Sequence, residues 1–139
     1  MLTIEAGTPE ERAYLEVKLN EFNAQMVPRT QAESIIFVDF SLKDNNGAIV
    51  GGINALAYGW KVIFVNVLWI DKRYRHGGYG SRLLLQVEEE AVKMGCHLIH
   101  LDTFDFQAKD FYLKQGYEVF GELADCPTGH KRFFLKKVL

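Results

Sequence analysis

A glycine-rich loop between a strand-like segment and a helix constrains this chain more than any other feature. Residues 60–70 are rich in Val, Ile and Phe, and residues 81–94 carry apolar side chains at helical spacing. Between them, residues 71–80 hold three glycines and three Lys/Arg residues. A helix start presents unpaired N–H groups and the positive end of the helix dipole, so it favours an anion. Because glycines let phosphate oxygens approach the backbone, the loop predicts a diphosphate ligand.

Two common phosphate-binding loops do not fit this segment. A Walker loop requires the run Gly-Lys-Ser/Thr at its second glycine, and the chain has no such run there. A dinucleotide-binding fingerprint requires a small residue three positions after Gly78-Tyr79-Gly80, where this chain has Leu83. It also requires the first strand of a βαβ unit, whereas this strand ends a meander. A tight turn without a ligand and a general nucleotide-phosphate site remain as alternatives.

The N-terminal part of the chain predicts a strand followed by a helix. Residues 2–6 alternate as a short strand does. Thr8 can cap a helix that has Pro9 in its first turn, and Glu11 completes a capping box. An apolar stripe at helical spacing follows, made of Leu15, Leu19 and Phe22.

The rest of the chain completes the order β-α-β-β-β-α-β-α-β-β. Asn46-Gly47 between two extended segments predicts a hairpin, and Gly95 and Gly116 end the two later helices. Strands are expected at 36–42, 48–58, 60–70, 97–103, 117–123 and 132–138, and helices at 81–94 and 107–115. This order describes one mixed α/β sheet in a single domain over residues 1–139.

Charge and composition argue against several classes of protein. Sixteen Lys+Arg against eighteen Asp+Glu give a net charge of −2, so nucleic acid is not an expected partner. The apolar runs are shorter than the roughly 18 residues of a membrane span, and the N-terminus lacks the pattern of a secretory signal. Cys96 and Cys126 are too few for a disulfide scaffold, which favours a cytoplasmic protein with free thiols. The spacing Cys96-His97-x-x-His100 fits no common zinc pattern, so no metal is expected.

Two motifs resemble the GNAT family of N-acetyltransferases. Arg75-His76-Gly77-Gly78-Tyr79-Gly80 matches the Arg/Gln-x-x-Gly-x-Gly/Ala signature of that family. About thirty residues on, Ala108-x-x-Phe111-Tyr112-x-x-x-Gly116-Tyr117 resembles the family's Ala-x-x-x-Tyr-x-x-x-Gly-aromatic stretch. The order of elements also matches, so the resemblance covers nearly the whole chain and is strongest to small bacterial members. It implies an α/β (α+β) fold with a mixed, mostly antiparallel sheet of about seven strands flanked by helices.

The resemblance implies acetyl-CoA as co-substrate and a small-molecule primary amine as acceptor. The pantetheine arm would lie along the strand that ends at residue 70, and the backbone of residues 75–81 would hold the pyrophosphate. The cofactor-binding residues that it implies are Leu68, Trp69, Ile70, Arg75, His76, Gly77, Gly78, Tyr79, Gly80, Ser81, Gln107 and Tyr112. The candidates for the adenosine 3′-phosphate, left undecided, are Lys72, Arg73, Arg82 and Lys114.

The catalytic residues implied are Tyr112 and Asn66. A phenol with pKa near 10 stays protonated at neutral pH and can donate to a thiolate whose thiol has pKa about 8.5. From the residues alone, Tyr112 could equally be a core aromatic. Asn66 stands where many members have a Glu as general base, so a water chain or another acidic group must take the proton. Asp105, where many members have Asn, either contacts the acceptor amine or is solvated.

Other functions stay open on the sequence alone. The absence of the usual Glu at Asn66 is consistent with a non-catalytic acyl-CoA-binding or sensing module. A protein or peptide amine could also replace the small acceptor. An exposed strand edge and the 13% aromatic content are consistent with a homodimer.

Overall fold

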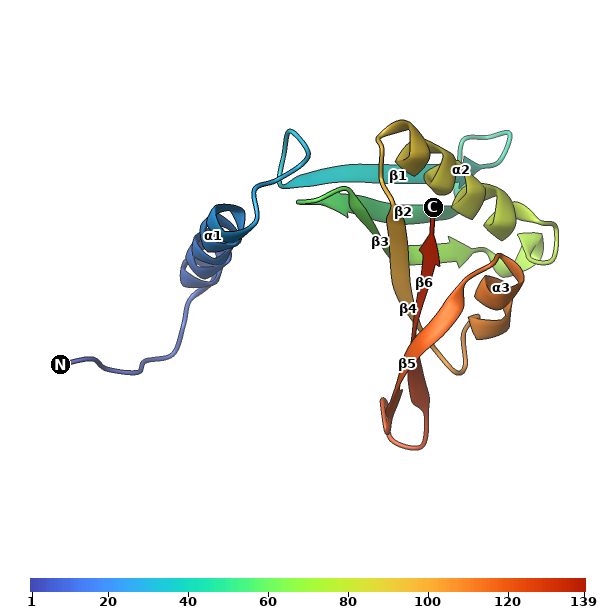
Figure 1. Cartoon of the computed structure of the whole chain (residues 1–139). Helices are drawn as coiled ribbons and strands as arrows, with labels where there is room; N and C mark the ends of the chain where they lie inside the picture. The colour runs from blue at the N-terminus through green and yellow to red at the C-terminus, as the bar shows by residue number, and fades with distance from the viewer.

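The computed structural model describes residues 1–139 as three α-helices and a six-stranded sheet. The elements are α1 (Pro9–Met26), β1 (Ile35–Lys43), β2 (Ile49–Tyr58), β3 (Val62–Ile70), α2 (Tyr79–Lys93), β4 (Leu98–Phe104), α3 (Lys109–Lys114), β5 (Glu118–Ala124) and β6 (Lys131–Val138) (Figure 1). The strand order is β1-β2-β3-β4-β6-β5, and only β3 and β4 are parallel. The expected α+β class with a mixed, mostly antiparallel sheet is confirmed. No helix is both long enough and apolar enough to span a membrane.

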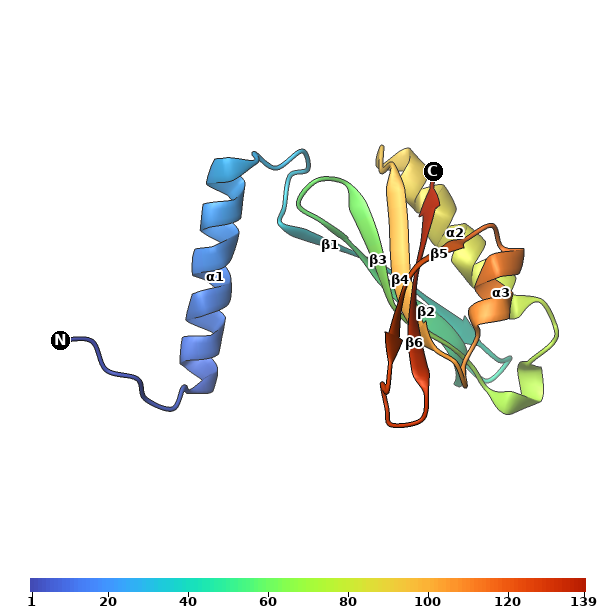
Figure 2. The ribbon, with the colours of Figure 1, turned by 60° about the horizontal axis from the view of Figure 1, so that its bottom comes forward.

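The strand expected at residues 2–6 is wrong, so the sheet has six strands instead of about seven. Residues 1–8 have no regular structure and are exposed. They lie beyond α1, well away from the sheet (Figure 2). Alternation in the sequence indicates which side chains would share a face, but a strand also needs an edge within reach.

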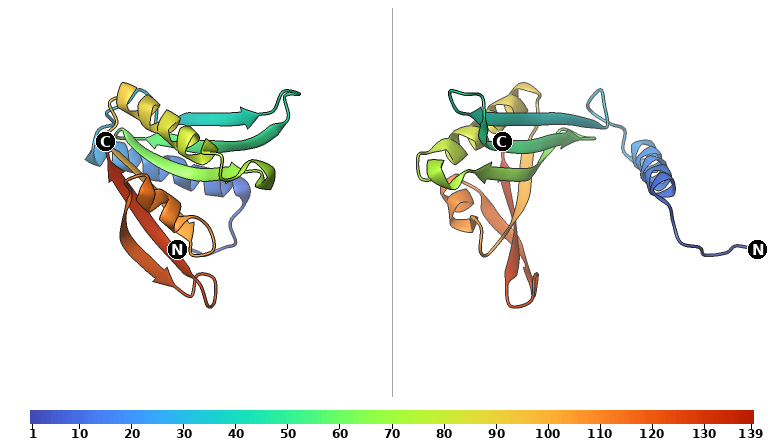
Figure 3. Two further views of the ribbon diagram at one scale, coloured as in Figure 1. Left: turned by 90° about the vertical axis from the view of Figure 1, so that its right-hand side faces the viewer. Right: turned by 180° about the vertical axis from the view of Figure 1, so that it is seen from behind.

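One face of the sheet carries the core. α2 and α3 cover this face, as Figure 3 shows. One row of core residues crosses five strands, and each residue pairs directly with the next. The row consists of Val38, Ala55, Val65, Leu101 and Leu135. The largest fully buried side chains include Ile53, Leu84 and Ile99, and each contributes about 1.5–3 kcal/mol by leaving water. This packing fixes α2 and α3 on the sheet and so positions the loops that join these helices to the strands.

β3 and β4 form a fork in the sheet. They pair only from Val62↔Leu98 to Val65↔Leu101 and then diverge. β2 continues to pair with β3 as far as Ile70. The backbone of residues 66–70 is therefore paired on one edge only, and the other edge faces the opening of the fork.

α1 begins as the sequence predicts, but its surroundings differ from those of the other helices. The Thr8 hydroxyl accepts from the backbone N–H of Glu11 at 3.2 Å, and the Glu11 carboxylate accepts from the N–H of Thr8 at 3.2 Å. This is the expected capping box. No residue of α1 is buried, however, and the helix stands apart from the sheet (Figures 2 and 3).

Candidate active site

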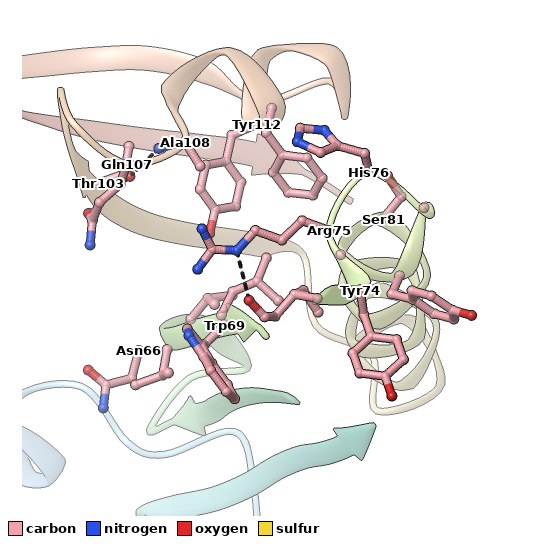
Figure 4. Close-up of a pocket in the computed structure, with 18 of the residues that line it drawn as sticks. Asn66, Trp69, Tyr74, Arg75, His76, Ser81, Thr103, Gln107, Ala108 and Tyr112 are labelled. Atoms are coloured by element: carbon pink, nitrogen blue, oxygen red, sulfur yellow. Dashed lines mark hydrogen bonds between the residues drawn. The ribbon is translucent and has the colours of Figure 1, made fainter. Parts of the chain in front are cut away.

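A cleft of about 890 Å³ opens at the fork between β3 and β4. Its walls come from the end of β3, the loop before α2, the start of α2, β4 and α3 (Figure 4). The predicted site residues that line it are Asn66, Leu68, Trp69, Ile70, Arg75, His76, Gly78, Tyr79, Gly80, Ser81, Gln107 and Tyr112. Gly77 was also predicted and does not line it. The fold thus gathers segments that are distant in the chain around one cavity.

The start of α2 meets the cleft without a side-chain cap. Gly78 is the N-cap residue, with φ 81° and ψ 4°, a left-handed conformation that glycine adopts without strain. The first turn holds no acidic residue. A Cβ on Gly80 would lie 3.4 Å from the ring of Phe111, so α3 packs closely against this turn. The uncapped N–H groups and the helix dipole make this end of the cleft suited to an anion.

Arg75 extends across the cleft, and its neighbour Arg73 is paired elsewhere. The Arg75 Nε donates to the carbonyl oxygen of Ile70 at 2.9 Å, which places the guanidinium over the free edge of β3 (Figure 4). Arg73 binds both oxygens of Asp71, at 3.0 and 3.2 Å, and this hydrogen bonding lowers the pKa of Asp71. Of the four 3′-phosphate candidates, Arg73 is therefore already paired, and none of the four lines the cleft.

Tyr112 contributes a hydroxyl group to the cleft. The side chain is 6% exposed, and its ring packs edge-on against Phe111 and Tyr117, with centroids 5.1 and 5.8 Å away. Burial, and then the charge of Asp102, raise the pKa of Tyr112 to about 12. All fully buried polar side-chain atoms have a hydrogen-bond partner, and the Tyr112 hydroxyl has none within the protein. Its oxygen therefore reaches the cleft surface (Figure 4).

Gln107 and Ser81 help to hold the walls of the cleft together. The Gln107 carbonyl oxygen accepts from the backbone N–H of Phe104 at 2.7 Å and from the Thr103 hydroxyl at 3.2 Å. The Gln115 amide donates to the Ser81 hydroxyl at 2.9 Å. These bonds tie α3 to the end of β4 and to the first turn of α2. Gln107 lines the cleft, and its NH₂ group has no hydrogen-bond partner within the protein.

Asn66 is the extra residue of a β-bulge. Val67 pairs with Asn54, and Val65 pairs with the next residue, Ala55. The N–H of Ala55 donates to the Asp39 carboxylate at 3.1 Å. Asn66 and Asp39 also line a smaller hollow of about 130 Å³ on the other face of the sheet. Asn66 therefore lies between this hollow and the main cleft, in a structure that is often found beside active sites.

Sequence reasoning missed two acidic residues beside Asn66, namely Asp39 and Asp102. Asp102 lines the cleft from β4, and one of its oxygens accepts from Arg132 Nε at 3.0 Å. The same oxygen lies 2.8 Å from Arg132 Nη2 in an ion pair. The fork and the bulge bring both acids near Asn66, and neither feature has a signal in the sequence. The predicted alternative, Asp105, does not line the cleft and pairs with His130 at 2.8 Å. Further lining residues that were not predicted are Val65, Val67, Tyr74, Thr103, Phe106 and Ala108.

Comparison with known proteins places this geometry in a family. The model of the family described as Acetyltransferase (GNAT) family matches residues 5–117. The blasticidin-S acetyltransferase of Streptomyces morookaense is 35% identical over 94 residues, which cover 67% of this chain and 65% of that protein. The match thus spans less than two thirds of the relative's length.

Two solved structures extend the comparison. The 1.9 Å crystal structure of an acetyltransferase from Bacillus cereus ATCC 14579 has a TM-score of 0.90 and 37% identity, and covers 99% of this chain and 98% of that chain. An aminoglycoside 6′-N-acetyltransferase complexed with coenzyme A has a TM-score of 0.65 over 98% of this chain and 97% of that chain. Its 18% identity shows a common fold alone. Since the family model matches most of the chain, this protein belongs to the GNAT acetyltransferase family.

Proposed function

We propose that this protein transfers the acetyl group of acetyl-CoA to a primary amine of a small-molecule acceptor. The observation that carries the proposal is the arrangement of three features around the cleft at the fork: an uncapped helix start, a free strand edge and the Tyr112 hydroxyl. They suit, in turn, a pyrophosphate, an extended pantetheine arm and a leaving thiolate. The coenzyme A bound to an aminoglycoside 6′-N-acetyltransferase of this fold supports the proposal.

The backbone and side chains around the cleft would hold the coenzyme at its pyrophosphate and along its pantetheine arm. The pyrophosphate would accept from the first N–H groups of α2, next to Gly78, where no side chain blocks its approach. The pantetheine amides would pair with the free edge of β3, as an added strand does. The Arg75 guanidinium would then exchange the carbonyl of Ile70 for a phosphate oxygen.

Acetyl transfer would need a proton donor for the leaving thiolate of CoA. The acceptor nitrogen forms a bond to the thioester carbon, the carbon–sulfur bond breaks, and the sulfur takes a proton from the Tyr112 hydroxyl. A pKa of about 12 keeps that phenol protonated at neutral pH. The phenolate then recovers its proton from solvent. Such a donor contributes about 10²–10⁴-fold to the rate.

On the acceptor side, we assign removal of the amine proton to Asp39, acting through water that the Asn66 amide orients. The Asn66 amide is not basic enough to take the amine proton itself. Asn66 does line the smaller hollow together with Asp39. One Asp39 oxygen accepts from Ala55, and the other has no partner in the protein. Asp102 is less suited to this role because Arg132 already donates a hydrogen bond to it and forms an ion pair with the same oxygen. Its negative charge would instead attract the cationic acceptor.

A small acceptor is favoured by the similarity to a blasticidin-S acetyltransferase. We propose that residues 1–139 act as one catalytic domain. We also propose that two copies act together, because α1 leaves one face of the sheet uncovered. A sensing module without turnover is the second candidate, favoured only by Asn66 in place of a carboxylate.

Acetyl-CoA binding and turnover distinguish these candidates. Thermal shifts would be measured with acetyl-CoA, CoA and ATP. CoA release would then be followed with blasticidin S, an aminoglycoside, a polyamine, an amino acid and a lysine peptide. The proposal predicts stabilisation by acetyl-CoA, little by ATP, and release of CoA with at least one small amine. Stabilisation with no turnover on any amine would favour the sensor. Equal effects of ATP and acetyl-CoA would instead indicate a general nucleotide-phosphate site.

A further inference from the structure

The N-terminal 26 residues form an arm that the rest of the chain does not cover. The arm comprises the extended residues 1–8 and α1 (Pro9–Met26). No α1 side chain is buried, and Leu15 and Phe22 are 66% and 55% exposed. α1 stands on the side of the sheet away from α2 and α3, and is separated from it (Figures 2 and 3). Because most of the stability of a helix in a protein comes from packing its apolar side chains, the arm needs a surface to pack against.

α1 is apolar on two opposite sides. One stripe consists of Leu15, Leu19, Phe22 and Met26. A second stripe, about half a turn around the helix, consists of Ala13, Val17 and Ala24. Glu, Lys and Gln side chains such as Glu21 and Gln25 lie between the stripes. A helix with apolar residues on more than one side is suited to burial between two layers, not to a solvated position.

The sheet has a matching uncovered surface, here called the bare face. It is centred on a cross-strand row of Phe37, Leu56, Phe64 and His100, which the strand register places directly opposite one another. This row lies beside the buried row of the core but points away from α2 and α3. Phe37 is 72% exposed. The arm and the bare face are therefore two unpartnered apolar surfaces on one chain.

The total exposed surface of the chain has the size expected of one half of a dimer. A folded monomer of 15.9 kDa exposes about 7,400 Å², whereas this chain exposes 9894 Å². The excess of about 2,500 Å² per chain, doubled for two chains, falls within the range of obligate homodimer interfaces.

Hydrogen bonds at the root of the arm hold it away from its own sheet. The Trp60 indole N–H donates to the carbonyl oxygen of Val27 at 2.8 Å, and the N–H of Thr30 donates to the carbonyl of Gly59 at 3.1 Å. The Gln31 amide binds Ala57 at 3.0 Å. Val27 is extended, with φ −134° and ψ 103°, as expected before Pro28. The chain is thus fixed to the β2–β3 turn where the arm leaves the domain.

The crystal structure from Bacillus cereus indicates that this position of the arm is shared. The arm makes up 26 of the 139 residues. A TM-score of 0.90 over 99% of the chain could not be reached if that fifth of the chain lay elsewhere in the relative. The two chains are 37% identical and both extend an apolar helix away from the sheet. We therefore expect the same kind of partner to cover the bare face in both proteins.

We propose that the chain forms an arm-exchanged homodimer, in which α1 of each copy covers the bare face of the other. The bare face meets the candidate active site at Asn66, which lines both the main cleft and the smaller hollow that contains Phe37 and Asp39. The arm of the second copy therefore forms a wall on the acceptor side of the cleft. This last point rests on the proposed function, whereas the exchange itself does not.

Reciprocal variants test the exchange. Leu19→Glu places a charge on the apolar stripe of α1, and Phe37→Glu places one on the bare face. Both side chains are exposed in the single chain, at 59% and 72%, so neither substitution disturbs the core. Gln25→Glu, in a polar stripe of the same helix, is the matched control. The readout is mass by light scattering in the absence of acetyl-CoA.

The expected mass is about 32 kDa for the wild type and the Gln25→Glu control, twice 15.9 kDa, and 15.9 kDa for each of the two disruptive variants. Mixing these two variants should restore a dimer, because the mixed pair keeps one intact arm on one intact face. A wild-type mass of 15.9 kDa, or variants that stay dimeric, or no recovery on mixing would each overturn the exchange.

A cross-link gives a second measurement that does not depend on disrupting the arm. Leu19→Cys and Phe37→Cys would be combined with Cys126→Ser and joined by a short bis-maleimide. Bonds between chains support the exchange, and bonds only within chains overturn it. If the arm also borders the acceptor, Leu19→Glu raises the acceptor KM at least several-fold and leaves acetyl-CoA affinity unchanged. An unchanged KM would remove the arm from the acceptor site while the mass data still decide the exchange.

Discussion

The charge of Asp102 on β4 acts on the phenol of Tyr112 on α3. Together with the larger effect of burial, it raises the pKa of Tyr112 to about 12. The protonated form is the proposed donor, so activity should not fall through this group between pH 7 and about 10. Since the folded-state pKa exceeds the ordinary value of 10.0, stability should be lost as the pH rises from about 10 to about 12.

The change that tests this relationship is Asp102→Asn. We expect the pKa of Tyr112 to fall from its wild-type value but to stay above 10.0, because burial remains. Tyrosinate absorbance during alkaline titration measures it, with Asp105→Asn as the control. An unchanged Tyr112 titration in Asp102→Asn would show that the two groups are not coupled.

The second prediction concerns the glycine at the start of α2. Gly78→Ala forces a side chain into a left-handed conformation, with φ 81°, and should lower the free energy of unfolding by about 1–2 kcal/mol. It should also weaken acetyl-CoA binding, because Gly78 lines the cleft where the pyrophosphate is proposed to bind. Gly129→Ala is the matched control, since its φ is 80° and nothing lies within 4 Å of the added Cβ.

Urea unfolding and calorimetric titration with acetyl-CoA measure the two effects separately. Both variants should lose similar stability, and only Gly78→Ala should lose affinity. Equal affinities in the two variants would argue against a pyrophosphate at this helix start.

The third prediction separates the acidic residues near the acceptor. Asp39→Asn removes the proposed base and should lower kcat/KM by about 10²–10⁴-fold at neutral pH, with acetyl-CoA affinity retained. Asp105→Asn, at the His130 pair outside the cleft, should leave kcat/KM close to the wild-type value. If Asp105→Asn alone impaired turnover, the assignment of Asp39 would be wrong.

The fourth prediction concerns stability away from the site. Lys137 Nζ lies 2.6 Å from the carboxylate of Glu88, whose side chain is 11% exposed, and Tyr117 donates to the same carboxylate at 3.3 Å. Lys137→Met leaves this carboxylate without its cation and should lower the free energy of unfolding by about 3 kcal/mol. Adding Glu88→Gln should recover most of that loss. Urea unfolding of the two variants decides the point, and a loss that persisted in the double variant would indicate packing instead of charge.

The sequence predicted the parts of this protein that local chemistry determines. The capping box at Thr8 and the glycine ends of α2 and α3 were confirmed within a few residues, because turns and caps depend on near neighbours. The glycine loop was also placed correctly between a strand and a helix. Its proposed ligand stays a prediction.

The features that depend on distant contacts were not predictable in the same way. Residues 2–6 alternate like a strand but have no edge to pair with. Leu15, Leu19 and Phe22 predicted the helix but not that it stands apart from the sheet with none of its residues buried. Asp39 and Asp102 come near Asn66 only through a bulge and a fork, which are properties of strand register.

Removal of the Tyr112 hydroxyl alone tests whether this residue donates the proton to the leaving thiolate. CoA release with a reactive small amine would be measured for the wild type, Tyr112→Phe and Tyr58→Phe, with the acetylated product identified by mass spectrometry. Tyr58 binds His100 at 2.7 Å outside the cleft and is the matched control. We expect an acetylated amine from the wild type and Tyr58→Phe, and a loss of about 10²–10⁴-fold in kcat for Tyr112→Phe with acetyl-CoA affinity unchanged. Full turnover by Tyr112→Phe, or no acetylated amine from the wild type despite tight acetyl-CoA binding, would contradict this expectation.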